Sequence, residues 1–170
     1  AFSEGLQLVD GNILNIEDYT FVDLEQNLPV DKFDAVYHLA ALPRVQYSID
    51  HPIETNRVNI EGTLKILEWA RQKAKRFVFA SSSSAEECKS PYALQKKTGE
   101  EYCRIYADVH GLETVSLRFF NVYGTRMDPQ GDYACLIPRH FALARKNKDL
   151  PIYGDGKQRR DFTYVDDVVE

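Results

Sequence analysis

Alternating apolar and polar stretches predict that short buried strands and amphipathic helices follow one another along the chain. Apolar runs bounded by polar residues occupy 34–39, 75–80 and 114–119, and each has the length of a strand rather than of a helix. A shorter apolar run at 6–9 is followed by the turn residues of 10–12. We expect strands at all four positions.

Apolar residues recur every three to four positions across 56–74, as on one face of a helix. Gly62 inside this segment lowers the stability of the helix by about 1 kcal/mol relative to alanine. A glycine at such a position indicates that another segment packs closely against it. The segment between strand and helix, 42–52, is expected to be a loop. The apolar stripe of the helix consists of Ile60, Leu64, Leu67 and Ala74.

A second helix carries start and stop signals. Ser90 can accept a hydrogen bond from the first turn, and Pro91 suits the first helical position. Gly111 can adopt the left-handed conformation that ends helices, so we expect a helix from Pro91 to about His110. A third helix is predicted at 136–146, after a loop at 128–135.

Strands that alternate with helices predict an α/β fold with right-handed crossovers and a parallel sheet covered on both faces. The length of 170 residues suffices for a core of its own. His38 lies inside an apolar strand, so it is interpreted as a hydrogen-bonded structural histidine rather than a catalytic one.

Composition excludes several classes of protein. The net charge of −5 argues against a nucleic-acid-binding protein. No apolar run is long enough to span a bilayer, and the first residues lack the pattern of a signal peptide. Three widely spaced cysteines indicate reduced thiols in a cytoplasmic protein, rather than disulfides or a metal site.

The candidate chemistry lies where the second helix begins. Tyr92 and Lys96 are four residues apart and therefore share one helical face. A nearby ammonium favours the phenolate, which makes Tyr92 a candidate general base. A serine from the run 81–84, at the end of the preceding strand, can hydrogen-bond the same substrate oxygen. Together these groups can take the hydroxyl proton of an alcohol while a cofactor takes the hydride from its carbon.

These motifs resemble the extended short-chain dehydrogenase/reductase family, in its NAD-dependent nucleotide-sugar epimerase/dehydratase branch. The resemblance is nearest to the UDP-glucose and UDP-N-acetylglucosamine 4-epimerases, and covers nearly the whole chain. It rests on the segments 38–41, 77–84, 90–96, 117–124 and 160–167, with Asn59, Gly62 and Thr63.

The resemblance implies a Rossmann-like doubly wound parallel sheet with the start of a smaller sugar-binding domain. Residues 1–120 would form the NAD-binding domain, and 121–170 part of the nucleotide-sugar-binding region. Asn59 resembles the asparagine that braces the active-site strand. Three departures also suggest a chain shortened at both ends and in one loop: no glycine-rich phosphate turn precedes Leu6, the chain stops at Glu170, and only five residues separate Ser84 from Ser90.

The implied reaction is NAD-dependent epimerisation at C4 of a UDP-sugar through a 4-keto intermediate, by a cytoplasmic homodimer. The alternatives are a nucleotide-sugar 4,6-dehydratase or decarboxylase, and an inactive fragment that only binds a nucleotide or a partner. Dehydratases place acidic residues directly after the catalytic serine or threonine, whereas Ser83 and Ser84 follow here.

Site residues follow from the same resemblance. Ser82, Tyr92 and Lys96 are the expected catalytic residues, with Ser83 as the near alternative to Ser82. Asn12 either contacts the adenine of NAD or is a simple turn residue. The expected cofactor-binding residues are Asn12, Ile13, Leu39, Ala40, Ala41, Ser81, Tyr92 and Lys96, and the expected substrate-binding residues are Ser82, Ser83, Asn121 and Arg160.

Overall fold

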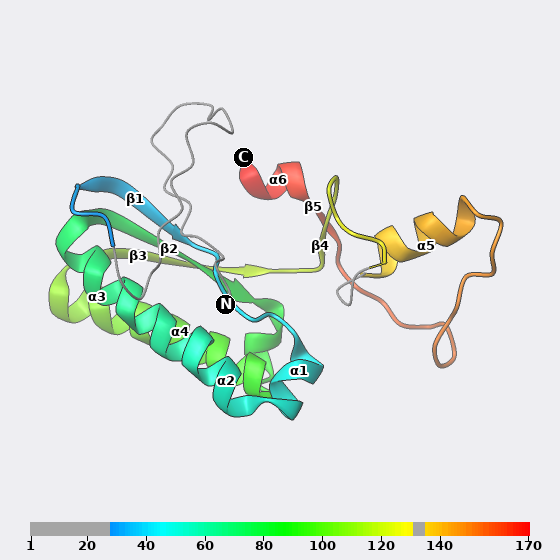
Figure 1. Cartoon of the computed structure of the whole chain (residues 1–170), viewed down its shortest axis with the longest axis horizontal. Helices are drawn as coiled ribbons and strands as arrows, with labels where there is room; N and C mark the ends of the chain where they lie inside the picture. Colours follow the sequence, from blue (N-terminus) through cyan, green and yellow to red (C-terminus); the bar gives the residue numbers. More distant parts are fainter. Residues whose placement is uncertain (1–27, 131–134) are drawn as a thin grey trace. The chain divides into compact units, whose positions relative to one another are not determined.

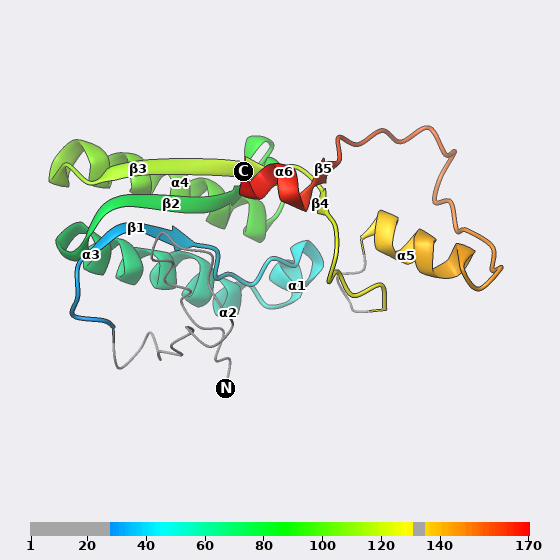
Figure 2. The same cartoon turned by 90° about the horizontal axis from the view of Figure 1, so that it is seen from above.

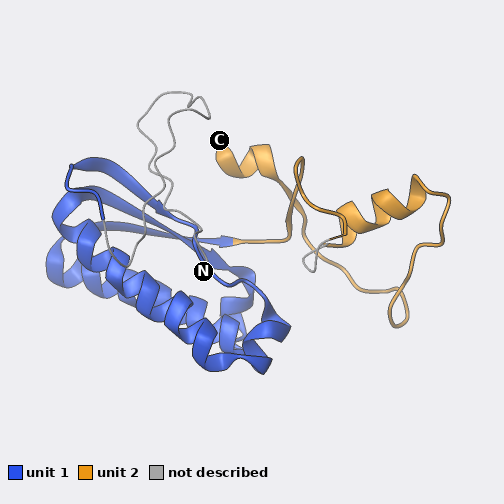
Figure 3. Cartoon of the chain, in the orientation of Figure 1, with its two compact units in different colours: residues 1–118 blue, residues 119–170 orange. Residues whose placement is uncertain are grey.

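The computed structural model describes residues 28–130 and 135–170. It divides into two compact units, Ala1–Arg118 and Phe119–Glu170 (Figure 3). The strand expected at 6–9, together with Asn12 and Ile13, lies outside the described residues.

Unit 1 contains a sheet in the order β1-β2-β3. Strands β1 (Phe33–His38) and β2 (Ala74–Ser82) pair in parallel, with His38 opposite Phe79. Strand β3 (Glu113–Phe119) pairs with the other edge of β2. The three strands expected within the described residues are therefore confirmed, and β2 extends further than expected, to include Ser81 and Ser82.

Two long helices lie against the same face of this sheet (Figure 1 and Figure 2). They are α3 (Thr63–Lys73) and α4 (Pro91–His110). Their apolar residues meet those of the strands in one core, which excludes water from the sheet on that side. The core consists of Val36, Ile66, Leu67, Ala70, Phe77, Phe79, Cys103, Tyr106 and Leu112.

The opposite face of the sheet stays open in the described part of unit 1. Tyr37, Val115 and Leu117 are exposed, and they alternate along their strands with residues that face the helices. Helices were expected on both faces of the sheet, and within the described ranges they cover one face.

The segment expected to be a loop at 42–52 holds a helix, α1 (Val45–Asp50), so that prediction was wrong. This helix has only six residues and no side-chain cap, so the sequence carries no start signal for it. A further short helix, α2 (Pro52–Asn56), follows it directly.

The helix expected at 56–74 is interrupted by a π-helical segment, Arg57–Gly62, before α3 begins. A π turn holds more residues than an α turn, so it rotates the residues on either side of it away from the expected stripe. Of that stripe only Leu67 is buried, and Ala74 begins β2 instead. The residues buried on this side are Asn59, Thr63, Ile66, Leu67 and Ala70.

The boundaries expected for α4 are confirmed. The Oγ atom of Ser90 accepts a hydrogen bond from the backbone N–H of Ala93 at 3.1 Å, and Pro91 occupies the first turn. Gly111 ends the helix with φ of +70°, in the left-handed region. The sequence therefore fixes the register of the helix that carries Tyr92 and Lys96.

Close packing of α4 on β2 depends on Gly99. A Cβ atom placed there would lie 2.4 Å from Cζ of Phe79. The prediction of close packing at Gly62 was wrong. A Cβ atom placed there would lie 3.8 Å from its nearest neighbour, the carbonyl oxygen of Arg57, which is an ordinary van der Waals distance. The glycine that lets a helix approach the sheet thus lies in α4.

Unit 2 contains a small parallel sheet, in which β4 (Val122–Tyr123) pairs with β5 (Thr163–Tyr164). Helix α5 (Leu136–Ala144) confirms the third expected helix and ends two residues early. Helix α6 (Val165–Val169) was not predicted. Part of the loop expected at 128–135 lies outside the described residues. Over the ranges that the structure describes, no helix has both the length and the apolar character needed to cross a membrane.

Replacing Gly99 by alanine should destabilise unit 1 by about 1–3 kcal/mol, because overpacking against Phe79 outweighs the better helix propensity of alanine. Gly62→Ala is the matched control and should be neutral or stabilising by up to about 1 kcal/mol. Urea unfolding followed by the fluorescence of Trp69, the single tryptophan, measures both. Equal effects of the two changes would contradict the packing account.

Candidate functional site

The candidate site is built on one face of helix α4. Tyr92, Lys96 and Glu100 follow one another at four-residue intervals and therefore lie in one row. Lys96 and Glu100 both contact the carboxyl end of β2. Ligands of open parallel sheets bind at this edge, so the row lies where a cofactor or substrate is expected.

Lys96 is buried beneath this edge, with 4% of its surface exposed. Its Nζ atom donates a hydrogen bond to the carbonyl oxygen of Ala80 at 2.7 Å. It lies 4.9 Å from the ring centroid of Phe79 and 6.0 Å from that of Tyr92. Burial lowers the pKa of Lys96 to about 8, so the group keeps its positive charge near neutral pH. The structure thus brings the expected Tyr92 and Lys96 together.

Tyr92 has a hydrogen-bond partner, Ser48, that the sequence did not predict. Its backbone N–H donates to Oγ of Ser48 at 3.0 Å, and that hydroxyl donates to the carbonyl oxygen of Val45 at 2.6 Å. Ser48 is fully buried. Helix α1 therefore satisfies a backbone donor in the first turn of α4 and fixes the start of the helix that carries Tyr92.

The serines of the run 81–84 have different hydrogen-bond partners. Ser81 is buried, and its Oγ donates to Oε1 of Glu100 at 2.6 Å. The Oγ atoms of Ser82 and Ser84 lie 2.9 Å apart, and Ser82 also accepts from the backbone N–H of Ser84 at 3.3 Å. Ser82 and Ser83 are half-buried. The hydroxyl of Ser81 is therefore bonded to Glu100 inside the protein. A contact of Ser81 with the cofactor stays a prediction, and it would be made by the backbone of this residue.

Asn59 braces the loop after β1. Its Oδ1 accepts from the backbone N–H of Leu42 at 2.7 Å, and its Nδ2 donates to the carbonyl oxygen of Leu42 at 3.1 Å. The same Nδ2 donates to Oε1 of Gln95 at 2.8 Å, and Gln95 donates to Oγ1 of Thr55 at 3.0 Å. Sequence reasoning found Asn59 but missed Gln95 and Thr55, because a polar residue gives no sign in the sequence that it is buried.

His38 is a structural histidine, as expected. Its Nε2 lies 2.9 Å from Oγ1 of Thr63, whose hydroxyl donates to the carbonyl oxygen of Asn59 at 2.7 Å. Because Thr63 has only one proton to give, Nε2 of His38 is the donor. Burial lowers the pKa of His38 to about 3, so the ring is neutral, with Nδ1 buried and unpaired within the described residues.

The expected cofactor residues after β1 are accessible. Leu39 is 63% exposed, and Ala40 and Ala41 are half-buried. Small side chains here let a flat ligand approach the backbone that Asn59 holds in place. The cofactor contacts of these residues remain predictions. Across residues 28–130 and 135–170, no group of histidine, cysteine and acidic side chains could hold a metal ion.

The two substrate residues expected in unit 2 lie on neighbouring segments. Nδ2 of Asn121 donates to the carbonyl oxygen of Asp161 at 2.8 Å. Nη1 of Arg160, the residue before Asp161, donates to the carbonyl oxygen of Arg159 at 2.7 Å, and Arg160 is exposed. Asn121 has φ of +38°, in a region where asparagine is among the more tolerated residues.

Comparison with known proteins shows the family of this chain. The sequence profile of the NAD dependent epimerase/dehydratase family matches residues 3–170. The chain belongs to this family. It is 33% identical to the UDP-glucose 4-epimerase of Mycolicibacterium smegmatis over 169 residues, which cover 90% of this chain and 54% of that protein.

Two further matches carry the names of different activities. The chain is 38% identical over 160 residues to the UDP-N-acetyl-alpha-D-glucosaminuronate decarboxylase of Bacillus cytotoxicus, which covers 83% of this chain and 49% of that protein. The structure matches the UDP-N-acetylglucosamine 4-epimerase of Methanobrevibacter ruminantium, solved with UDP-N-acetylmuramic acid, with a TM-score of 0.79 and 36% identity. That match covers 86% of this chain and 52% of the other.

The chain therefore spans about half the length of the relatives that it matches. The Rossmann-like α/β fold expected from the sequence is confirmed by these matches, and the cofactor of the family is NAD.

Lys96→Met tests the burial of the cation. Lys96 has a pKa lowered from 10.5 to about 8, so charging it costs folding stability below pH 8, and this cost disappears as pH rises to 10.5. The parent should therefore gain up to about 3 kcal/mol of stability relative to Lys96→Met between pH 8 and 10.5. Urea unfolding of both proteins at several pH values measures this.

Lys97→Met is the control, since the side chain of Lys97 is 38% exposed and its pKa is raised by hydrogen bonds to Glu101 and Glu100. Relative to this variant the parent should show no such gain over the same pH range. A flat difference for Lys96→Met would refute the buried, charged lysine.

Proposed function

We propose that this protein catalyses NAD-dependent epimerisation at C4 of a UDP-sugar, through a 4-keto intermediate. The single observation that carries the proposal is the buried Lys96 ammonium, held by the carbonyl of Ala80 and 6.0 Å from the ring of Tyr92. A cation held this close to a phenol favours the phenolate, which is the state that a general base needs.

Each catalytic residue has a role that follows from its place. Tyr92 takes the proton of the sugar hydroxyl at C4 and later returns it. Ser82, or Ser83 as the alternative, donates a hydrogen bond to the same oxygen and orients it. Lys96 stabilises the negative charge that the Tyr92 oxygen carries before it takes the proton. NAD supplies the hydride acceptor and donor for C4.

The described residues fit NAD in two respects. An ammonium has three N–H donors, and the Ala80 carbonyl takes one, so Lys96 can also donate to a ribose hydroxyl of the cofactor. Leu39, which is exposed, and the half-buried Ala40 and Ala41 offer backbone to a flat ring, and Asn59 holds Leu42, the residue that follows them. Asn12 and Ile13, proposed for the adenine, lie outside the described residues.

The acids near the serines support epimerisation over dehydration. A dehydratase needs a carboxyl group close to its catalytic serine or threonine for the loss of water. Glu86 instead pairs with Arg118, and Glu87 pairs with Lys89 at 2.6 Å. Both carboxylates are engaged with cations, and neither directly follows Ser82.

A nucleotide-sugar decarboxylase is the second candidate, favoured by the 38% identity to the Bacillus cytotoxicus decarboxylase. Decarboxylation begins with the same oxidation at C4, so Tyr92, Lys96 and Ser82 would have the same roles. The difference lies in the sugar, which must carry a carboxylate at C6.

Arg160 and Asn121 are proposed to bind the diphosphate of the UDP-sugar. A guanidinium forms paired hydrogen bonds with phosphate oxygens, and that of Arg160 is exposed. The amide of Asn121 holds the backbone of the segment that carries Arg160. Three free cysteines are consistent with the proposed cytoplasmic location. The homodimer is proposed from the family resemblance alone.

A product assay separates the two candidates. The full-length gene product is incubated with UDP-glucose, UDP-N-acetylglucosamine and UDP-glucuronate, and the products are analysed by NMR. The proposal predicts inversion at C4 for at least one sugar, with no release of carbon dioxide. Loss of the carboxylate carbon from UDP-glucuronate would favour the decarboxylase.

Tyr92→Phe should abolish turnover, to less than about 1% of the parent, because it removes the base and only one hydroxyl group. The unfolding midpoint should remain close to that of the parent. Tyr102→Phe, the same change elsewhere on α4, should retain activity. Turnover by Tyr92→Phe at the rate of the parent would show that Tyr92 is not the base.

Arg160→Ala should weaken UDP binding by about 1.5–3 kcal/mol, the usual value of a hydrogen bond to a charged group. NAD binding should change little. Arg159→Ala is the matched control and should leave both affinities unchanged. Calorimetry with UDP and with NAD measures them, and equal UDP affinity in Arg160→Ala and the parent would exclude the diphosphate contact.

A further inference from the structure

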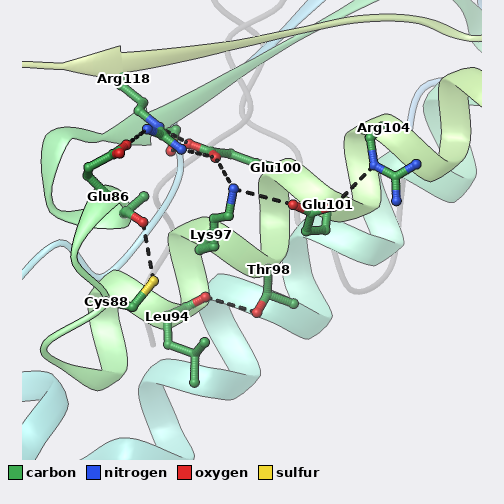
Figure 4. A network of polar contacts seen from close by, with 11 residues as sticks. Glu86, Cys88, Leu94, Lys97, Thr98, Glu100, Glu101, Arg104 and Arg118 are labelled. Atoms are coloured by element: carbon green, nitrogen blue, oxygen red, sulfur yellow. Dashed lines mark hydrogen bonds and ion pairs between the residues drawn. The ribbon is translucent and has the colours of Figure 1, made fainter.

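A second polar cluster joins α4 to the sheet beside the candidate site (Figure 4). Arg118, on β3, donates from Nε to Oε1 of Glu100 at 2.7 Å and from Nη2 to Oε2 at 2.8 Å. Oε1 of Glu100 also accepts the hydroxyl of Ser81 at 2.6 Å. Arg118 additionally pairs with Glu86 (Figure 4). One carboxylate on α4 thus binds side chains from two strands of the sheet.

Glu100 differs from an ordinary surface acid. Its side chain is 11% exposed, and the paired hydrogen bonds from Arg118 help to hold its pKa at about 2. Glu101, the next residue, is 47% exposed and pairs only with Lys97 and Arg104 in the contacts described. Glu100 therefore makes a bridge between layers, whereas Glu101 makes contacts along the helix.

The position of Ser81 connects this bridge to the candidate site. Ser81 lies between Ala80, the acceptor for Lys96, and Ser82, the candidate catalytic serine. Helix α4 therefore holds two successive residues of β2, through Lys96 and through Glu100, one helical turn apart. These two contacts fix where the end of β2 lies along the helix that carries Tyr92.

We propose that Glu100 and Arg118 are positioning residues, which act through Ser81 to hold Ser82 at the distance from Tyr92 that the reaction requires. The inference rests on the proposed function. Neither residue touches the reacting atoms. Because a misplacement of about 1 Å in a catalytic group can cost about a hundredfold in rate, loss of the bridge should affect the chemical step more than binding.

The test compares Glu100→Gln with Glu101→Gln in the full-length gene product. Both changes remove one charge without changing side-chain shape, and only the first weakens the bridge to β2. We expect Glu100→Gln to lower kcat by about tenfold or more, with KM for the UDP-sugar within about twofold of the parent. Glu101→Gln should leave both constants unchanged. The first hydride transfer, followed as the absorbance of reduced NAD, should slow by the same factor as kcat.

Ser81→Ala is a second variant that leaves the Glu100–Arg118 pair in place, and it applies even where Glu100→Gln does not fold. It should lower kcat in the same direction, again without a change in KM. Equal kcat for Glu100→Gln and Glu101→Gln, a loss confined to KM, or an unaffected Ser81→Ala would each overturn the inference. A parent without activity, or an active Tyr92→Phe, would instead refute the proposed function.

Discussion

The burial of one ammonium group is the interaction on which the rest of the site depends. Taking the charge of Lys96 out of water is unfavourable, and the protein offsets this with the Ala80 carbonyl and the ring of Phe79. The approach of α4 to β2 that makes this contact possible requires a residue without a side chain at Gly99. Packing in the core thus sets the electrostatics around Tyr92.

Buried polar side chains next to the site hold its elements in place. Ser48 supplies an acceptor to the first turn of α4, and Asn59 ties the loop after β1 to Gln95 on that helix. Each is buried and hydrogen-bonded, so none can shift without leaving a polar group unpaired. Within unit 1, the first turn of α4 and the loop after β1 are therefore fixed relative to one another.

The sequence predicted those parts of this arrangement that have local causes. Ser90, Pro91 and Gly111 set the ends of α4, and a spacing of four placed Tyr92 and Lys96 on one face. It did not predict the contact of Ser48 with α4, because that contact joins segments distant in sequence. It also did not predict the π-helical segment before α3. Gly62 and Gly99 show the same limit, since nothing in the sequence distinguishes the glycine that packs closely from the one that does not.

The most direct test of the central claim follows the C4 hydrogen of the sugar. The full-length gene product is incubated in deuterated water with UDP-glucose, UDP-N-acetylglucosamine and UDP-glucuronate, and the products are examined by proton NMR. A base at Tyr92 that removes only the hydroxyl proton, with the hydride kept on NAD, predicts a C4 epimer that retains its original C4 hydrogen. Deuterium at C4, or no inversion with any of the three sugars, would contradict the account.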